Sequence, residues 1–185
     1  MGIRMDRAVT SIIATCLLLL AIPGNAWPAS KAEVDARVKS AMQKLYIDSP
    51  EARELAAKAA GILVFPRVYK VGFGFGGKFG EGALLINKAT AQYYRVASGS
   101  IGFQVGAKAR SEVLMFMTAT ALQAFRQSDG WEAGVDGSVA IVQFGVGESI
   151  DTHSGQDPII GFVFGNKGLM YDLSLEGTKY WQTQK

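Results

Sequence analysis

Hydrophobic positions in residues 31–46 recur at the spacing of an α-helix. Val34, Val38 and Met42 fall on one side of such a helix, and Leu45 continues that side. Charged residues of both signs occupy the other side, whereas a membrane-surface helix has a mainly basic polar face. We therefore expect this helix to pack on a core or on a partner.

A second helix is marked in residues 48–61, DSPEARELAAKAAG. Ser49 is a natural N-cap, Pro50 suits the first turn, and Glu51 favours the positive end of the helix dipole. Gly61 can cap the exit.

From residue 62 onward the pattern becomes one of short apolar or alternating segments separated by glycine and polar residues. We expect the first strand, ILVF, to stop at Pro66. Thr118 can cap one mid-chain helix, ATALQAFRQ, with Leu122 and Phe125 facing inward. Further strands are expected at residues 70–77, 82–88, 91–97, 100–109, 112–117, 138–147, 158–165 and 168–177.

These elements predict the α+β class. We expect a strongly curved, mostly antiparallel β-sheet or partial barrel, with N-terminal helices at about 31–60 and a β-rich body at about 62–181. No second-domain boundary is visible, so residues 27–185 are expected to form a single domain.

Glycine recurs in VGFGFGGKFG, residues 71–80. The segment satisfies the dinucleotide pattern G-x-G-x-x-G and, with Lys78, most of the phosphate-loop pattern. Both patterns require a helix directly after the glycines, but two more glycines follow, and Phe79 replaces the hydroxyl residue that would bind magnesium. We therefore expect no nucleotide binding.

Taken as one strand, this segment would alternate glycine with phenylalanine. Gly72, Gly74 and Gly76 would share one face, and Phe73 and Phe75 would share the other. The aromatic face should be buried, and the bare face should allow a close approach of backbone or a sharp curve.

The first 26 residues have the three parts of an export signal. MGIRMDR is positively charged, residues 8–22 are apolar, and PGNA ends in small residues, so we expect a signal peptide cleaved after Ala26. The apolar run is shorter than the ~20 residues of a membrane span, which disfavours the alternative of an uncleaved anchor. The expected location is outside the cytoplasm, in the periplasm.

Cys16 is the only cysteine. IATC faintly resembles a lipoprotein signal, but apolar residues continue after Cys16, so a lipid anchor is the less favoured alternative. Cleavage after Ala26 would leave a mature chain without a thiol or a disulfide.

The sequence lacks the residue groups of common catalytic and metal sites. His153 is the only histidine and lies in a polar loop, and neither G-x-S-x-G nor H-E-x-x-H occurs. Asp129, Glu132 and Asp136 lack the calcium-loop spacing. The net charge of +3 is too small to indicate nucleic acid. We therefore predict no enzyme activity, no metal, no cofactor and no nucleic-acid partner.

Six segments together carry a family resemblance: GILVFPRV, GFGFGGKFGEGALL, YYRVASGSIGFQVGAKARSEVLMFMT, ALQAF, GWEAGVDGSVAIV and GLMYDLSLEGTKYW. In their order and spacing the chain resembles bacterial SYLF-domain proteins, over about residues 52–181. The eukaryotic members of that family bind phosphoinositides and regulate actin. The resemblance implies non-enzymatic binding of anionic phospholipid head groups, without actin partners for an exported protein.

Five basic residues lie near the ends of the two glycine-bearing strands. If those ends adjoin, the residues form one cluster that could hold phosphate head groups at a membrane surface, although strand-end cations are commonly only solubilising. An envelope scaffold that binds a protein partner through the N-terminal helix is the alternative function. The cluster comprises Arg67, Lys70, Lys78, Lys108 and Arg110.

Overall fold

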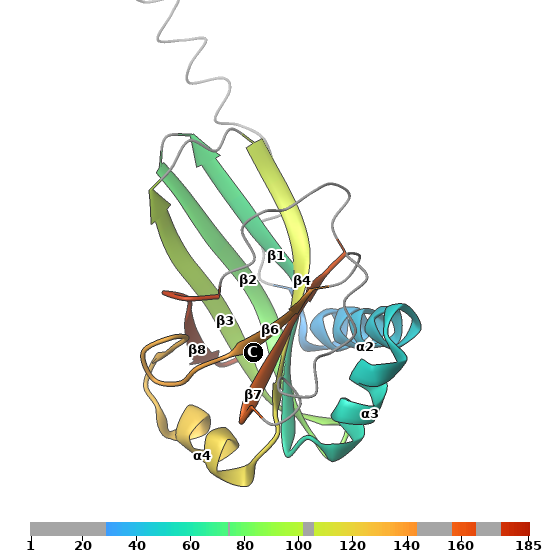
Figure 1. Ribbon diagram of the computed structural model, residues 1–185. Coiled ribbons are helices and arrows are strands. Elements are labelled where there is room, and N and C mark those ends of the chain that lie inside the picture. Colours follow the sequence, from blue (N-terminus) through green and yellow to red (C-terminus); the bar gives the residue numbers. More distant parts are fainter. Residues whose placement is uncertain (1–28, 74, 102–105, 144–156, 166–174) are drawn as a thin grey trace, which may run out of the picture.

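The computed structural model describes residues 29–73, 75–101, 106–143, 157–165 and 175–185. In this part of the chain, three helices accompany one eight-stranded sheet that curls into a half-barrel (Figure 1). The helices are α2 (Lys31–Asp48), α3 (Pro50–Lys58) and α4 (Ala119–Gln127). The strands are β1 (Gly61–Phe73), β2 (Phe75–Ile86), β3 (Ala89–Ile101), β4 (Gly106–Phe116), β5 (Trp131–Glu132), β6 (Ala140–Gln143), β7 (Ile159–Phe164) and β8 (Lys179–Thr183).

The strand order is β5-β8-β3-β2-β1-β4-β7-β6, and among these described strands only the β6–β7 pairing is parallel. The predicted α+β class with a strongly curved, mostly antiparallel sheet is therefore confirmed. The signal peptide, Cys16 and His153 lie outside the described residues.

Each face of the sheet carries its own core. On the α4 face, Phe125 packs against the rings of Tyr94, Phe116 and Trp131, at centroid distances of 5.0, 4.8 and 5.6 Å. This core includes residues from both ends of the strand order, as expected for the inside of a curled sheet. On the α2 face, the apolar side of α2 and Ala52 of α3 cover the middle strands.

The helices follow the predicted patterns, with one difference at an exit. The hydroxyl oxygens of Ser49 and Thr118 accept hydrogen bonds from the backbone N–H groups of Ala52 and Ala121, both at 3.1 Å, so both predicted N-caps are confirmed. However, α3 ends before Gly61, which begins β1.

Strand β1 does not stop at Pro66, as the sequence analysis expected. The pairing register of β1 shifts between Val64 and Arg67 against β2 and between Phe65 and Val68 against β4. The strand therefore passes Pro66 through a β-bulge, where an extra residue without a ladder N–H is tolerated. The Ser111 hydroxyl donates a hydrogen bond to the Pro66 carbonyl at 3.0 Å.

The glycine segment is not one strand either. Gly72 pairs with Gly76, and Phe73 pairs with Phe75, so the chain reverses between β1 and β2. Gly74 lies outside the described residues. The expected alternation over residues 70–77 is thus interrupted by a hairpin.

Close backbone approach does occur nearby, in β2. A Cβ atom on Gly82 would lie 2.1 Å from the Val64 carbonyl oxygen, and one on Gly80 would lie 2.7 Å from that of Arg67. These glycines face the β1 bulge, so they leave the room that the bulge requires.

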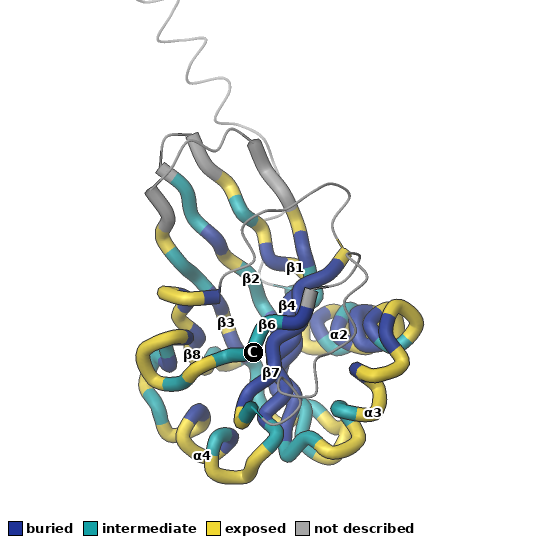
Figure 2. The backbone as a smooth tube through the Cα atoms, in the orientation of Figure 1, coloured by how far each residue is buried: buried dark blue, intermediate teal, exposed yellow. Residues whose placement is uncertain are grey.

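Beyond the β7 and β8 pairings, β1–β4 continue as four strands, and among the described residues these parts pair only with each other. We call residues 67–73, 75–81, 98–101 and 106–110 the distal arm. The predicted strand 100–109 is divided between β3 and β4, on opposite sides of the β1–β2 hairpin. Figure 2 shows fewer buried positions along the distal arm than in the half of the sheet near the helices.

At the C-terminal end, the predicted strand 168–177 lies mostly outside the described residues, and its described end, 175–177, is not a strand. Strand β8, which the sequence analysis missed, follows it directly.

Candidate functional site

The predicted basic cluster comes together in the backbone. Lys70 of β1 is the register partner of both Lys78 of β2 and Lys108 of β4. Arg110, two residues after Lys108 on β4, lies opposite Val68 of β1. The strand ends therefore adjoin, as expected. The side chain of Lys108 lies outside the described part of the chain.

The side chains do not form one surface, however. Lys70 and Lys78 share the α4 face with buried Val68, because residues directly opposite each other and two apart in a strand face the same side. Arg67 is exposed on the other side, the α2 face, beside the bulge.

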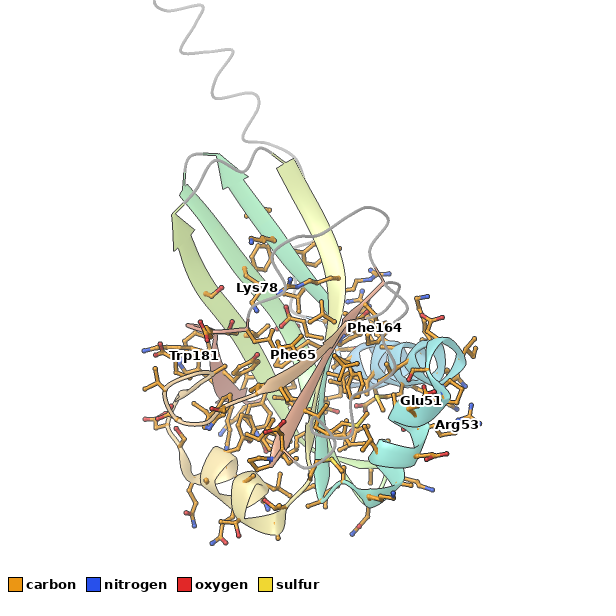
Figure 3. All side chains as sticks on the ribbon, in the orientation of Figure 1. Glu51, Arg53, Phe65, Lys78, Phe164 and Trp181 are labelled. Carbon is orange, nitrogen blue, oxygen red and sulfur yellow. The ribbon has the colours of Figure 1, made fainter. Side chains whose placement is uncertain are left out.

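Two of the predicted residues are buried around one carboxylate. The Lys78 ammonium lies 3.1 and 3.2 Å from the two Glu112 carboxylate oxygens, and the Arg110 Nε and Nη2 lie 2.7 and 2.6 Å from Oε1. The side chains of Lys78, Glu112 and Arg110 are 4%, 0% and 4% exposed. We call these three residues the buried triad. Figure 3 shows Lys78 on the part of the sheet beyond Phe65.

Burial lowers the pKa of Lys78 from its usual value, since the ammonium is removed from water, and the Glu112 carboxylate opposes this shift. Because both cations are buried and hydrogen-bonded to Glu112, they are not at a surface that a head group could contact. The sequence signal for the triad is Glu112 itself, a single carboxylate in the apolar strand EVLMFM, since a buried charge requires partners.

Exposed aromatic side chains lie instead on the α2 face of the distal arm. The rings of Tyr69 and Phe79 stack with centroids 5.6 Å apart and remain 38% and 50% exposed. Val71, two residues after Tyr69, is 41% exposed. The side chains of Phe73 and Phe75, which we expected to be buried, lie outside the described part.

A groove of about 1090 Å³ runs from these rings to β8 and the N-terminal part of α2. Arg95 lies 3.4 Å from a Glu81 carboxylate oxygen, and Arg37 is paired with Glu33. In the described part of the chain, Arg67 forms no ion pair. We call this site the arginine–aromatic groove, defined by Arg37, Arg67, Tyr69, Phe79, Arg95 and Trp181.

Of these six residues, only Arg67 was predicted from the sequence as a site residue. Alternating aromatics in a strand are typical of a buried face, so Tyr69 and Phe79 carried no signal of exposure. Arg37 and Arg95 are separated from Arg67 in the sequence and meet it only through the sheet register and the helix packing.

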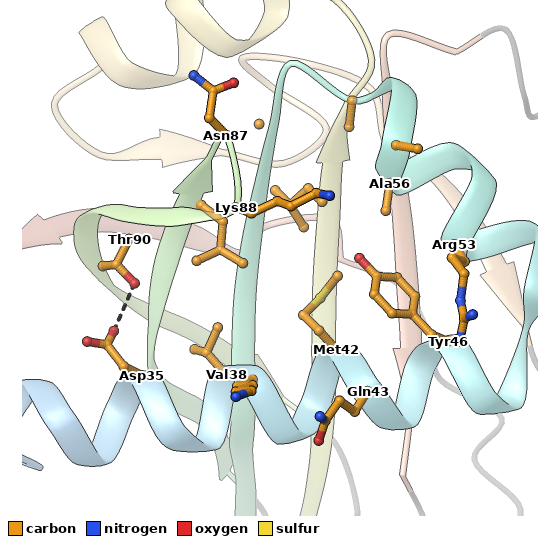
Figure 4. A pocket seen from close by; sticks show the side chains of 16 residues that line it. Asp35, Val38, Met42, Gln43, Tyr46, Arg53, Ala56, Asn87, Lys88 and Thr90 are labelled. Atoms are coloured by element: carbon orange, nitrogen blue, oxygen red, sulfur yellow. Dashed lines mark hydrogen bonds between the residues drawn. The ribbon is translucent and has the colours of Figure 1, made fainter.

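A second groove of about 970 Å³ lies between α2, α3 and the β2–β3 hairpin (Figure 4). Val38 and Met42 contribute to its floor, and Lys88 extends over it from the hairpin. We call it the helix–hairpin groove.

Neither a group of metal ligands nor a helix able to span a membrane occurs among the described residues. Among those that the structure describes, no three His, Cys, Asp or Glu side chains are grouped closely enough to hold a metal ion. No described helix has both the length and the apolar character needed to span a membrane. The Asp136 carboxylate accepts a hydrogen bond from the Glu132 backbone N–H at 2.7 Å, which is turn stabilisation.

Comparison with known proteins supports the resemblance. Residues 97–185 match the model of the Ysc84 (SYLF) family, described as Las17-binding protein actin regulator. No curated protein matches the chain. The matched region includes β4, which carries Glu112 and Arg110 of the buried triad, and β3 from residue 97 onward. Arg95, in the earlier part of β3, precedes the matched region. Residues 97–185 of the chain are thus similar to the Ysc84 (SYLF) family.

Proposed function

We propose that this domain binds the surface of anionic phospholipid membranes through the arginine–aromatic groove. The observation that carries the proposal is the presence of exposed aromatic rings beside arginines on one face of the distal arm. Aromatic side chains suit the boundary between head groups and acyl chains, and arginine binds phosphate oxygens in a bidentate manner. The proposed site thus replaces the predicted basic cluster, and Arg67 is the one residue that the two have in common.

Charge supports an anionic ligand. The groove is lined by three arginines, Arg37, Arg67 and Arg95, and by two carboxylates, Glu33 and Glu81, which pair with Arg37 and Arg95. Because the net charge of the chain is only +3, attraction to a membrane has to be local. It should weaken as salt shortens the Debye length, which is ~8 Å at physiological ionic strength.

We further propose that the domain acts without catalysis and in the periplasm. The export signal in residues 1–26 supports this location. The intact mass of the protein recovered from the periplasm tests it, since a lipidated chain beginning at Cys16 contradicts cleavage after Ala26.

Co-sedimentation with phosphatidylglycerol vesicles, compared with phosphatidylcholine vesicles, tests the binding site. Arg67→Gln should weaken binding to phosphatidylglycerol roughly fivefold, as expected for one basic residue near an anionic surface. Phe79→Ser should also weaken binding, because it removes an exposed ring that is available to enter the head-group region. Arg126→Gln, at an exposed position on α4, is the matched control and should bind as the wild type does.

If Arg67→Gln and Phe79→Ser bind as the wild type does, the groove is not the membrane site. Equal binding to both vesicle types would exclude recognition of anionic head groups. Absence of binding to either would favour the alternative, a protein partner, for which exposed Ile47 near the end of α2 is the first residue to replace.

A further inference from the structure

The helix–hairpin groove has an apolar floor made of small and medium side chains. Val38 and Met42 of α2 form one side, Ala56 of α3 forms another, and Leu85 of β2 lies between them. Leu85 and Ala56 are only half-buried, so apolar surface remains accessible in the groove. Its volume of about 970 Å³ is at the upper end of the range for small-molecule sites, ~300–1,000 Å³.

Cations surround this floor. Lys39 and Lys88 line the groove, and in the part of the chain that the structure describes neither forms an ion pair. Arg53 lies with its guanidinium carbon 5.5 Å from the centroid of the Tyr46 ring. The groove therefore presents three cationic groups beside apolar surface.

The one carboxylate that lines the groove is already hydrogen-bonded. Asp35 accepts hydrogen bonds from the hydroxyl groups of Thr90 at 2.9 Å and Tyr93 at 3.0 Å. Figure 4 shows the Asp35–Thr90 bond at one end of the groove, away from Tyr46 and Arg53. The charge of the groove is thus complementary to an anion.

Lys88 occupies a backbone position that disfavours lysine. It is the second residue of the two-residue β2–β3 turn, with φ of 65°, and Asn87 before it has φ of 51°. Two positive φ values are the pattern of a type I′ turn, in which glycine is preferred at the second position. A non-glycine residue in this conformation at a ligand site is a pointer to function. Here, the lysine ammonium is carried over the groove (Figure 4).

We propose that the helix–hairpin groove binds a fatty acid of about twelve carbons or more. The acyl chain would lie along Val38, Met42 and Leu85, and the carboxylate would accept charge-assisted hydrogen bonds from Lys39 and Lys88. This site shares no lining residue with the arginine–aromatic groove, so it is independent of the proposed membrane binding.

Isothermal titration calorimetry with dodecanoate at pH 8, below its micellar concentration and without vesicles, tests this proposal. Lys88→Gly and Lys39→Gln should each weaken dodecanoate binding roughly fivefold, by loss of one cation beside the anionic head. Lys88→Gly should at the same time raise the melting temperature, because glycine favours the positive φ of the turn. Ala56→Leu should abolish binding by filling the groove.

Matched controls separate this site from general charge effects. Lys44→Gln, on the same helix but outside the groove and paired with Asp48, should bind dodecanoate as the wild type does. Arg67→Gln, in the other groove, should also leave the affinity unchanged. The proposal is overturned if wild-type protein does not bind dodecanoate, if dodecanol binds equally well, or if both Lys39→Gln and Ala56→Leu bind as the wild type does.

Discussion

Gly82 of β2 lies so close to β1 that no side chain fits between them. A Cβ atom there would meet the Val64 carbonyl oxygen at 2.1 Å and a Phe65 ring carbon at 2.7 Å. Gly99 of β3 is the opposite case, since a Cβ atom there would have no neighbour within 4 Å. Glycine is therefore required by close packing at position 82, whereas packing places no constraint on position 99.

Gly82→Ala should lower the free energy of unfolding by at least ~1–3 kcal/mol, because the methyl group forces backbone apart at the bulge. Gly99→Ala is the matched control and should leave stability equal or slightly higher. Urea unfolding of both variants measures the difference. Equal stability of Gly82→Ala and the wild type would mean that the bulge yields freely.

At the scale of elements, the buried triad links two strands that are not neighbours. Lys78 of β2 and Glu112 of β4 are separated by β1, which carries the bulge between them. Strand β1 thus continues through Pro66, and the Lys78–Glu112 ion pair connects its neighbours β2 and β4 across its α4 face. The triad and the bulge together hold the register of the start of the distal arm.

Glu112→Gln should destabilise the protein by ~3–5 kcal/mol, because it leaves two buried cations without their carboxylate. Lys78→Met should cost less, since Glu112 keeps Arg110 and the ammonium is replaced by an apolar group of similar length. Thermal unfolding of the two variants compares these losses. A Glu112→Gln variant as stable as the wild type would show that the triad does not stabilise the fold.

At the scale of the whole molecule, the curl encloses an aromatic core that contains the buried phenol group of Tyr180. Burial raises the pKa of Tyr180 well above its usual value, and the Glu112 carboxylate nearby adds to the shift. Tyr180 contacts Phe65 and Trp131, at centroid distances of 5.5 and 5.7 Å. Ionisation of Tyr180 in the folded state is therefore opposed by the packing of this core.

Stability should fall as the pH rises above about 10, the usual tyrosine pKa. Above this pH the unfolded chain loses the Tyr180 proton while the folded chain keeps it, so the folded state binds more protons and the free energy of unfolding decreases with pH. The lowered pKa of Lys78 has the opposite effect just below pH 10.5, its usual pKa. There the unfolded chain keeps a proton that folded Lys78 loses, so the free energy of unfolding increases with pH. Tyr180→Phe should show a shallower alkaline loss in chemical unfolding at pH 9 to 11. An unchanged slope would mean that Tyr180 does not contribute.

Local interactions in the sequence were sufficient to predict the helices and the class of the fold. Ser49 and Thr118 were recognisable as N-caps because their bonds reach only three residues along the chain. The apolar periodicity of α2 and the run ILVF similarly reported which positions are buried. The sequence also predicted correctly that no helix follows the glycines of VGFGFGGKFG, since β2 continues as a strand to Ile86.

Only the tertiary structure decided which charges are buried and which face each strand residue occupies. The extra bulge residue at Pro66 puts Val68 and Lys70, rather than Arg67, on the same face as Phe65, and a reversal within VGFGFGGKFG pairs glycine with glycine. The Lys78–Glu112 pair spans 34 residues. Such contacts depend on register and curvature, which arise from many weak interactions between distant segments, so no short stretch of this sequence contains them.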